Sequence, residues 1–341
     1  MRVVTARVDP GVQALRVSGV HPVTSSSDVG RRRIAHPAAI LARMSVVLPP
    51  ILLAGVGRTP GGAEWIDRLP SLVAGACARW GLRLGPPFTD GAASWCAPAT
   101  LADGRRAVLK VSFPHDEARH EAVALRAWHG HGVPRLHEAH EDDWALLLER
   151  VEPGSPLSRA PGGAVERLTA AADVARSLWS VTGAVEVPSM ADVCAGWADV
   201  LEHRATRYGV QVERAVDLLR TLPGSSDVLV HGDLNPGNLL DGGGGRWVAI
   251  DPKPMRGDPA YDLWPLLEQV DDPFEHPEPQ AVLRDRVALL AGLLDLDPAR
   301  IAAWAFARCT ESALWVWDQL GDEPGGRAIL GQAAVWARVA G

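Results

Sequence analysis

His231-Gly-Asp-Leu-Asn-Pro-Gly-Asn238 places an aspartate and an asparagine five residues apart, and the apolar run Trp247–Ile250 soon afterwards leads into Asp251. A carboxylate such as that of Asp233, held on a rigid loop, can orient a bound hydroxyl and accept its proton. An amide oxygen and a second carboxylate are hard ligands that suit Mg²⁺, which takes few protein groups and leaves its other positions to phosphates and water. The stretch therefore predicts Asp233 as a general base and Asn238 and Asp251 as Mg²⁺ ligands.

The interval from Asp233 to Asn238 is that of the protein-kinase signature H-R-D-L-x-x-x-N. Gly232 stands where this signature has arginine, which favours a kinase of small molecules over a protein kinase. By itself, His-Gly-Asp is also compatible with a turn that caps a helix, and Asn238 and Asp251 are common residues in turns and at strand ends. Those everyday roles do not explain the combination, whereas phosphoryl transfer needs this set of positioning and charge-neutralising groups.

Lysine is scarce, because only Lys110 and Lys253 are lysines among 34 basic residues. Lys110 lies in the apolar run Ala107–Val111, where a lone charge is costly unless it is paired or contacts a ligand. The expected partner is Glu121, on the inward face of the following helix, since such a pair holds nucleotide phosphates in kinases. The alternative is an edge strand with an outward Lys110 and a solvated Glu121. Lys253 is predicted to reach phosphate or, alternatively, to balance Asp251 at the surface.

Two glycine-containing segments are candidates for a phosphate-binding loop. Residues 89–95 precede a predicted hairpin but do not have the G-x-G-x-x-G pattern. Backbone amides there, together with the hydroxyl of Ser94, are predicted to cap a nucleotide phosphate. Residues 241–245 contain four consecutive glycines, but they join two strands rather than a strand and a helix, so we expect an ordinary turn.

Composition narrows the class of protein. The 341 residues suffice for two modest lobes, and 47% hydrophobic and 22% charged residues are typical of a soluble globular protein. The net charge of −7 argues against a nucleic-acid partner. Four widely separated cysteines argue against a zinc site or a disulfide framework and suit a reducing compartment. No run is apolar enough to span a bilayer. We therefore expect a cytoplasmic protein without a nucleic-acid or membrane partner.

Periodicity and turn residues divide the chain into three parts. Residues 1–43 lack sustained periodicity and are predicted to be a disordered tail or an extension upstream of the true start at Met44. Residues 44–150 combine short strands with helices and form the predicted N-terminal, nucleotide-binding lobe. Residues 151–341 are mostly helical outside 228–251 and are predicted to hold the catalytic loop and the substrate site. The expected fold class is α+β, with a small β-rich lobe and a larger helical lobe.

The predicted elements were assigned from apolar spacing, caps and turn residues. Asp258 is expected to cap a helix, and Asp262, one turn on, to brace the catalytic loop. The predicted helices are 64–81, 115–128, 164–182, 190–207, 210–221, 260–270, 279–294, 297–320 and 326–338. The predicted strands are 94–100, 106–111, 133–138, 144–149, 228–230, 239–240 and 247–250.

These motifs together resemble the aminoglycoside phosphotransferase superfamily, and within it the streptomycin 6-kinase and hydroxyurea phosphotransferase group. The similarity spans about Met44 to the C-terminus. It is carried by Val108–Val111, Arg119–Leu125, Leu146–Arg150 with Pro153-Gly154, His231–Leu239, and Ala249–Lys253 with Gly257–Pro259. The resemblance implies a two-lobed protein-kinase-like fold, ATP and Mg²⁺ as cofactors, and transfer of the γ-phosphate to a hydroxyl.

The resemblance also implies roles for individual residues. Asp233 would be the base, Asn238 and Asp251 the Mg²⁺ ligands, and Lys110 with Glu121 would hold the phosphates. The backbone from Glu149 to Val151 would bind adenine. The acceptor pocket of the family tends to be acidic, and the candidates in this chain are Asp271, Asp272, Glu275, Glu278 and Glu311.

Three functions remain open at this point. The expected acceptor is a small molecule, cationic and polyhydroxylated, most simply streptomycin. Another small hydroxyl acceptor, such as hydroxyurea or a metabolite, is the first alternative, because fold and motif fix the reaction and not the acceptor. A catalytically silent ATP-binding pseudokinase is the second. The oligomeric state is left open, and a monomer is compatible with the pattern.

Overall fold

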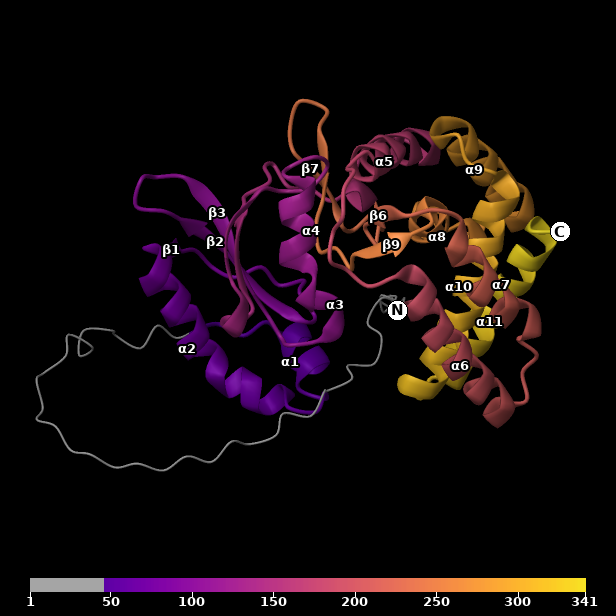
Figure 1. Ribbon diagram of the computed structural model, residues 1–341, viewed down its shortest axis with the longest axis horizontal. Helices are drawn as coiled ribbons and strands as arrows, with labels where there is room; N and C mark the ends of the chain where they lie inside the picture. The colour runs from indigo at the N-terminus through magenta and orange to yellow at the C-terminus, as the bar shows by residue number, and fades with distance from the viewer. Residues whose placement is uncertain (1–45) are drawn as a thin grey trace, which may run out of the picture. The chain divides into compact units, whose positions relative to one another are not determined.

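The computed structural model describes residues 46–341, which form two compact units (Figure 1). One unit, the sheet unit, consists of residues 46–116 and 137–150, and the other, the helical unit, of residues 117–136 and 151–341. The expectation for residues 1–43 lies outside the described residues. Residues 117–136 precede the predicted division after residue 150, yet they belong to the helical unit. The assignment of separate domains stays a prediction.

A five-stranded sheet forms the frame of the sheet unit. Its order is β1-β2-β3-β5-β4, and the strands are Arg83–Leu84, Ser94–Thr100, Arg106–Ser112, Ala145–Glu149 and Leu136–His140, named here in that order. The predicted hairpin is confirmed, because β2 and β3 pair antiparallel around the turn at Gly104, whose φ is +87°. On β3, Lys110 lies between Cys96 of β2 and Leu146 of β5.

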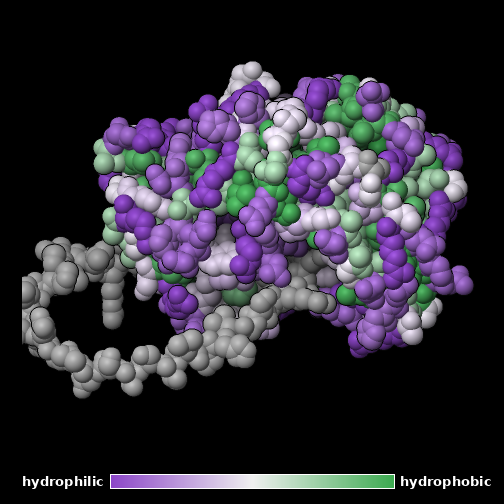
Figure 2. Space-filling view, viewed as in Figure 1, coloured by the Kyte–Doolittle hydropathy of each residue, from purple (hydrophilic) through white to green (hydrophobic). Residues whose placement is uncertain are grey.

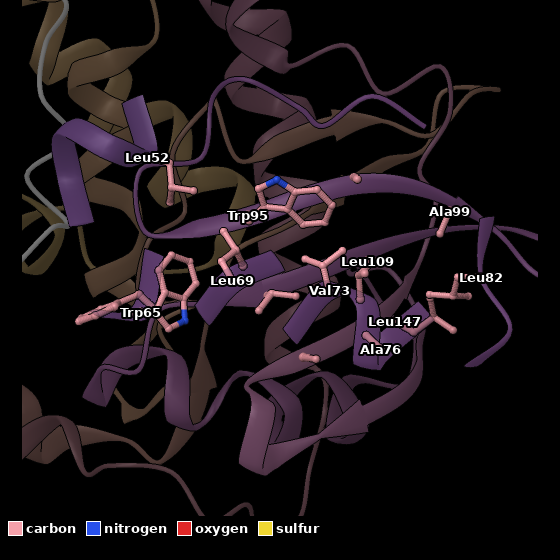
Figure 3. Close-up of a cluster of buried hydrophobic side chains, with 14 of the residues drawn as sticks. Leu52, Trp65, Leu69, Val73, Ala76, Leu82, Trp95, Ala99, Leu109 and Leu147 are labelled. Atoms are coloured by element: carbon pink, nitrogen blue, oxygen red, sulfur yellow. The ribbon is translucent and has the colours of Figure 1, made fainter. Parts of the chain in front are cut away.

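Two helices precede the sheet, α1 (Pro50–Val56) and α2 (Gly62–Trp80). The apolar residues of α2 recur at helical spacing and are buried in one cluster with Leu109 of β3 (Figure 3). The helix ends where Gly81 takes a left-handed conformation, which glycine adopts without strain. The predicted helix 64–81 is therefore confirmed, whereas α1 was not predicted because its seven residues are too few for a clear periodicity.

Helices dominate the helical unit, as predicted. They are α3 (Asp116–Arg119, whose first residue belongs to the sheet unit), α4 (Glu121–Trp128), α5 (Ala164–Trp179), α6 (Met190–Tyr208), α7 (Glu213–Thr221), α8 (Trp264–Gln269), α9 (Pro279–Leu294), α10 (Pro298–Gln319) and α11 (Glu323–Val339). The predicted helix 115–128 is broken at His120 into α3 and α4. Helix α10 packs against α11, α7 and α6 and forms the centre of this unit (Figure 1).

Two short two-stranded antiparallel sheets interrupt the helices. Strand β6 (Val228–Val230) pairs with β9 (Met255–Gly257), and β7 (Leu239–Asp241) pairs with β8 (Trp247–Ala249). The glycine run is the turn between β7 and β8, as predicted. Strand β9 was not predicted, because its three residues carry no alternation by which to recognise it.

Polar residues cover most of the face in Figure 2, and apolar residues are interspersed among them. Among residues 46–341, no helix has the length and apolar character that crossing a bilayer requires.

Candidate functional site

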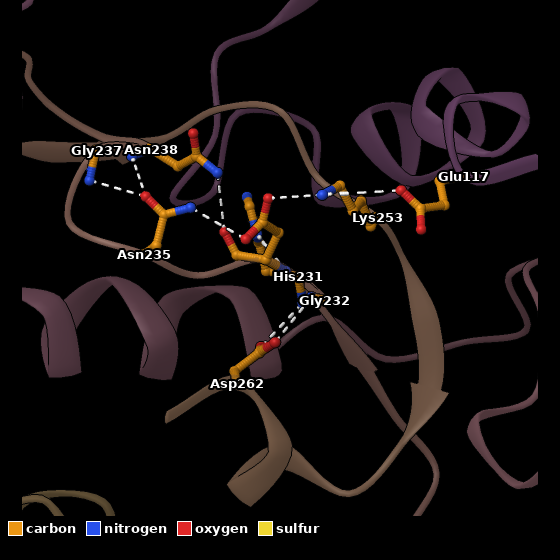
Figure 4. A network of polar contacts seen from close by, with 9 residues as sticks. Glu117, His231, Gly232, Asn235, Gly237, Asn238, Lys253 and Asp262 are labelled. Carbon is orange, nitrogen blue, oxygen red and sulfur yellow. Dashed lines mark hydrogen bonds and ion pairs between the residues drawn. The ribbon is translucent and has the colours of Figure 1, made fainter. Parts of the chain in front are cut away.

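The loop of residues 231–238, here called the HGD loop, leaves the buried strand β6 and is anchored by Asp262. One carboxylate oxygen of Asp262 accepts a hydrogen bond from the His231 amide at 2.9 Å, and the other accepts from the Gly232 amide at 2.8 Å (Figure 4). The first oxygen also accepts from Trp179 Nε1 at 3.0 Å. Burial raises the pKa of Asp262, while His231 and these hydrogen bonds act in the opposite direction. The predicted bracing role of Asp262 is confirmed.

Asp258, four residues before Asp262, caps the 3₁₀ helix Pro259–Leu263, as expected. Its carboxylate accepts a hydrogen bond from the Ala260 amide at 3.0 Å. It also accepts one from Trp304 Nε1 of α10, at 2.6 Å. The cap thus ties the segment that carries Asp262 to the central helix of the helical unit.

Asp233 lies on this loop with both carboxylate oxygens engaged. Oδ1 accepts a hydrogen bond from Asn235 Nδ2 at 3.0 Å, and Oδ2 lies 3.0 Å from Lys253 Nζ (Figure 4). The side-chain oxygen of Asn235 in turn accepts from the amides of Gly237 and Asn238. Asn235 was not predicted as a site residue, although an asparagine two residues after Asp233 is a signal in the sequence that points to it.

The amide of Asn238 is oriented by the loop itself. Its Nδ2 donates to the backbone carbonyl of Asp233 at 3.0 Å. A carbonyl can only accept, so the NH₂ group must face it and the Oδ1 atom is directed away. The Asn238 carbonyl accepts from the Ile250 amide at 2.8 Å, because β7 and β8 pair in that register. The glycine turn therefore brings Asn238 beside Asp251.

Asp251 follows β8 in a left-handed conformation, with φ at +58°, and is exposed. Aspartate tolerates this conformation better than most side chains, and its presence at the end of a strand turns the chain back toward the HGD loop. Asn238 directly precedes β7 and Asp251 closely follows β8, so both lie at the open end of this hairpin and offer oxygen atoms as metal ligands. A set of two hard oxygen donors fits Mg²⁺ bridged to phosphates. The role of these two residues as ligands stays a prediction.

Lys253 is not the surface lysine of the alternative interpretation. Its side chain is 18% exposed, and its Nζ lies 3.0 Å from Asp233 Oδ2 and 3.7 Å from Glu117 Oε2. Burial raises the pKa of Glu117 to about 7; Lys253 opposes this shift, and the carboxylates of Asp233 and Asp251 add to it. No periodicity or motif in the sequence points to Glu117, because its partner lies in a distant part of the chain.

Three predicted nucleotide-binding residues lie in the sheet unit. Lys110 is buried on β3 at 5% exposure. The hydroxyl of Ser94 donates to the hydroxyl of Ser112 at 2.9 Å across the β2–β3 pair. Glu149 ends β5 and is half-buried. Their contacts with a nucleotide stay predictions.

Glu121 and Val151 belong to the helical unit. Glu121 is the first residue of α4 and is 3% exposed, so its carboxylate is removed from water. A buried carboxylate is costly unless a cation or hydrogen-bond donors face it. Val151 directly follows the sheet unit. Since Lys110 and Glu121 belong to different units, their pairing stays a prediction.

Two of the acidic acceptor-pocket candidates have their charge matched within the protein. Asp271 Oδ1 lies 3.0 Å from Arg167 Nη2. Glu311 of α10 is buried, and its carboxylate lies 2.8 Å from Arg308 Nη1 and 3.6 Å from Arg204 Nη1. A carboxylate that already faces two guanidinium groups has little attraction left for a cationic ligand. Glu311 therefore contributes to packing of the helical unit rather than offering a free negative charge.

Gly232 is required by a close backbone approach. Its φ is +83°, and a Cβ atom built on it would lie 1.9 Å from the carbonyl oxygen of Lys253. The Lys253 amide also donates to the His231 carbonyl, at 2.8 Å. An arginine at this position, as in protein kinases, would displace the chain that carries Lys253.

Replacing Gly232 by Ala is expected to destabilise the protein by about 3 kcal/mol, from the positive φ and the displaced carbonyl together. Gly209→Ala is the matched control, because Gly209 also has a positive φ, +66°, but nothing lies within 4 Å of its Cβ position. It should cost only about 1 kcal/mol. Denaturant unfolding of both variants measures the difference. Equal losses would show that the close approach at Gly232 is not constraining.

His231 is expected to make stability depend on pH. Burial lowers its pKa, partly opposed by the carboxylates of Asp262 and Asp233, and its Nδ1 accepts from the Asp233 amide. In the unfolded chain the imidazole titrates near pH 6.5. Below that pH His231 binds a proton in the unfolded chain but stays neutral in the folded protein. The free energy of unfolding therefore falls as the pH falls. His231→Asn lacks the imidazole and should not show this loss. As the pH is lowered from 7.5 to 5.5, the melting temperature of wild type should therefore fall toward that of His231→Asn. Parallel curves would contradict this.

Comparison with known proteins gives a consistent picture. Residues 79–320 match the family model of aminoglycoside/hydroxyurea antibiotic resistance kinases. Streptomycin 6-kinase of Streptomyces glaucescens is 36% identical over 306 residues, which cover 85% of this chain and 95% of the relative. Hydroxyurea phosphotransferase of Kitasatospora aureofaciens is 36% identical over 301 residues, covering 84% and 85% of the two chains.

Solved structures agree on the fold. A macrolide 2'-phosphotransferase of Brachybacterium faecium superposes with a TM-score of 0.52 at 22% identity, covering 79% of this chain and 98% of that one. A choline kinase of Streptococcus pneumoniae gives a TM-score of 0.55 at 14% identity, covering 80% and 99%. The predicted α+β, protein-kinase-like fold is confirmed.

Proposed function

Because the chain belongs to the family of aminoglycoside/hydroxyurea antibiotic resistance kinases, we propose that it transfers the γ-phosphate of ATP to a hydroxyl of streptomycin, at position 6. The observation that supports this best is the pair of relatives named streptomycin 6-kinase, which match over most of their length. Such a transfer inactivates the antibiotic and gives resistance. We place the reaction in the cytoplasm, where ATP is available.

Asp233 is the proposed base. Its carboxylate has two further lone-pair directions beyond those that face Asn235 and Lys253, so it can accept the proton of the attacking hydroxyl while both partners hold it. Proton acceptance by a positioned carboxylate contributes about 10²–10⁴-fold to a rate. The HGD loop supplies the rigidity that this requires, since Asp262 and Asn235 bind its backbone on either side of Asp233.

Asn238 and Asp251 are the proposed ligands of Mg²⁺. When bound, this ion neutralises charge on the nucleotide phosphates. The protein's part is to orient the Asn238 amide and to bring Asp251 next to it, since Asn238 directly precedes β7 and Asp251 closely follows β8. The hydrogen bond from Asn238 Nδ2 to the Asp233 carbonyl then links the metal ligands to the base.

Lys110 and Glu121 are the proposed phosphate-binding pair, with Ser94 at the phosphates and the backbone at Glu149–Val151 at adenine. Burial of both Lys110 and Glu121 supports this, because a buried charge without a partner or ligand is costly. A lysine with three rotatable donors suits phosphate oxygens as a compact point charge.

Hydroxyurea is the second candidate acceptor, since a hydroxyurea phosphotransferase is as similar to this chain as a streptomycin 6-kinase. The two acceptors differ greatly in size and charge. A site shaped for a bulky cationic sugar would bind hydroxyurea weakly, because few groups would be desolvated against it.

The deciding experiment compares acceptors. Purified protein with Mg-ATP is given streptomycin, hydroxyurea or choline, and ADP release is followed with phosphate incorporation. We expect kcat/KM for streptomycin to exceed that for hydroxyurea by at least about 10²-fold, and choline to give only the background rate. Preference for hydroxyurea would overturn the assignment of acceptor, and phosphate incorporation into neither would overturn the proposal.

A further inference from the structure

One ammonium group bridges two carboxylates in the helical unit. Lys253 Nζ lies 3.0 Å from Asp233 Oδ2 and 3.7 Å from Glu117 Oε2 (Figure 4). The three residues come from the HGD loop, the segment after β8, and the short helix α3. Lys253 and Glu117 are mostly removed from solvent, at 18% and 28% side-chain exposure. An ion pair in such surroundings is less screened than one at the surface.

The backbone fixes the direction from which Lys253 approaches. Its amide donates to the His231 carbonyl at 2.8 Å. Its carbonyl occupies the space that a side chain at position 232 would need, which only glycine leaves free. The left-handed turn at Asp251 directs the chain into this position. The fold therefore delivers Lys253 to Asp233 by contacts that involve neither of the two side chains.

The contact restrains the carboxylate of Asp233. Asn235 donates a hydrogen bond to Oδ1 and Lys253 forms an ion pair with Oδ2, so rotation of the carboxylate plane would weaken one interaction or the other. A lysine side chain is itself flexible, with four methylene groups whose ordering costs entropy. A second carboxylate beside the ammonium reduces that freedom, and Glu117 supplies it at 3.7 Å.

We propose that Lys253 and Glu117 are positioning residues for the phosphoryl transfer. Lys253 holds the Asp233 carboxylate in the orientation that meets the acceptor hydroxyl, and Glu117 acts only through Lys253 by holding its ammonium group. This inference rests on the proposed role of Asp233 as the base. It departs from the first expectation for Lys253, contact with phosphate, because its Nζ faces two carboxylates.

The test is a double-mutant cycle in the full chain, with Lys253→Met, Glu117→Gln and the double variant. Lys253→Met should lower kcat with streptomycin by about 10²-fold, the loss typical of a misplaced reacting group. KM for ATP should change less than about threefold, because uniform nucleotide binding is untouched. Glu117→Gln should lower kcat by about tenfold, and the double variant should be no slower than Lys253→Met, because coupled residues are not additive.

Two further variants keep the result interpretable. Lys253→Arg retains a cation and should recover at least about tenfold of the kcat lost in Lys253→Met, whereas a packing role would not distinguish charge in this way. Glu323→Gln is a control, since Glu323 lies at the start of α11 and forms an exposed ion pair with Arg327 at 2.8 Å. It should leave kcat unchanged. Melting temperatures measured without nucleotide verify that each variant is folded.

Specific outcomes would overturn the inference. A raised KM for ATP with kcat unchanged in Lys253→Met would make Lys253 a nucleotide ligand instead. Additive losses in the double variant would show that Glu117 acts independently of Lys253. Asp233→Asn is assayed alongside: if it keeps full turnover, the proposed base is wrong. If it is inactive while Lys253→Met is as fast as wild type, only the positioning role fails.

Discussion

Asp233→Asn is expected to lower kcat for streptomycin phosphorylation by about 10³-fold while leaving the fold intact. The amide is nearly isosteric with the carboxylate and can still face Asn235, but it cannot accept the proton of the acceptor hydroxyl. Lys253 would lose its closest anion at the same time, so a modest fall in stability should accompany the loss of activity. Steady-state kinetics with a phosphate-incorporation readout measure the effect.

Asp192→Asn provides the control for this substitution. Asp192 lies exposed in the first turn of α6, so the same chemical change there should leave kcat within about twofold of wild type. Loss of activity in both variants would point to a general effect of charge. Retention of wild-type kcat by Asp233→Asn would show that the carboxylate is not needed as a proton acceptor.

Asp262→Ala is expected to reduce the free energy of unfolding by about 3–5 kcal/mol. The carboxylate accepts from the amides of His231 and Gly232 and from Trp179 Nε1, and alanine would leave the buried His231 amide and the two partly buried donors without this acceptor. Burial of the Asp262 carboxylate, which raises its pKa, is itself unfavourable. Removing the carboxylate offsets part of the cost. The melting temperature should fall by roughly 10 °C, as scanning calorimetry would measure.

Asp297→Ala is the matched control for the loss of an aspartate acceptor. Asp297 is exposed and caps α10 by accepting from the Ala299 amide at 2.9 Å. Its removal should cost about 1 kcal/mol, because water can replace an exposed cap. If Asp262→Ala cost no more than this, Asp262 would not be the anchor of the HGD loop.

Elements with strong periodicity or clear end signals were predictable. The stripe of Trp65, Leu69 and Val73 specified α2, and the bounds predicted for α9 agree with those observed. The Gly-rich turn was correctly distinguished from a phosphate-binding loop, because strands lie on both sides of it. Strand β9 and helix α1 were missed, because neither shows a clear strand alternation or helical period over its few residues.

The site was predictable only where its chemistry is local in sequence. Asp233, Asn238 and Asp251 follow a spacing that loop and hairpin geometry dictate. Glu117 was missed because its partner Lys253 is brought to it by tertiary packing, which residue spacing does not encode. The scarcity of lysine did carry information, since Lys253 faces the proposed base. A position that needs a compact cation is where lysine persists in an arginine-rich chain.

Single-turnover transfer from γ-labelled ATP to streptomycin, with wild type and Asp233→Asn in excess over nucleotide, tests directly whether Asp233 is the base. We expect wild type to move one phosphate to the antibiotic, while Asp233→Asn binds the same nucleotide and leaves the antibiotic unlabelled on that timescale. Label that appears only as inorganic phosphate with wild type, or equal transfer by both proteins, would contradict this expectation.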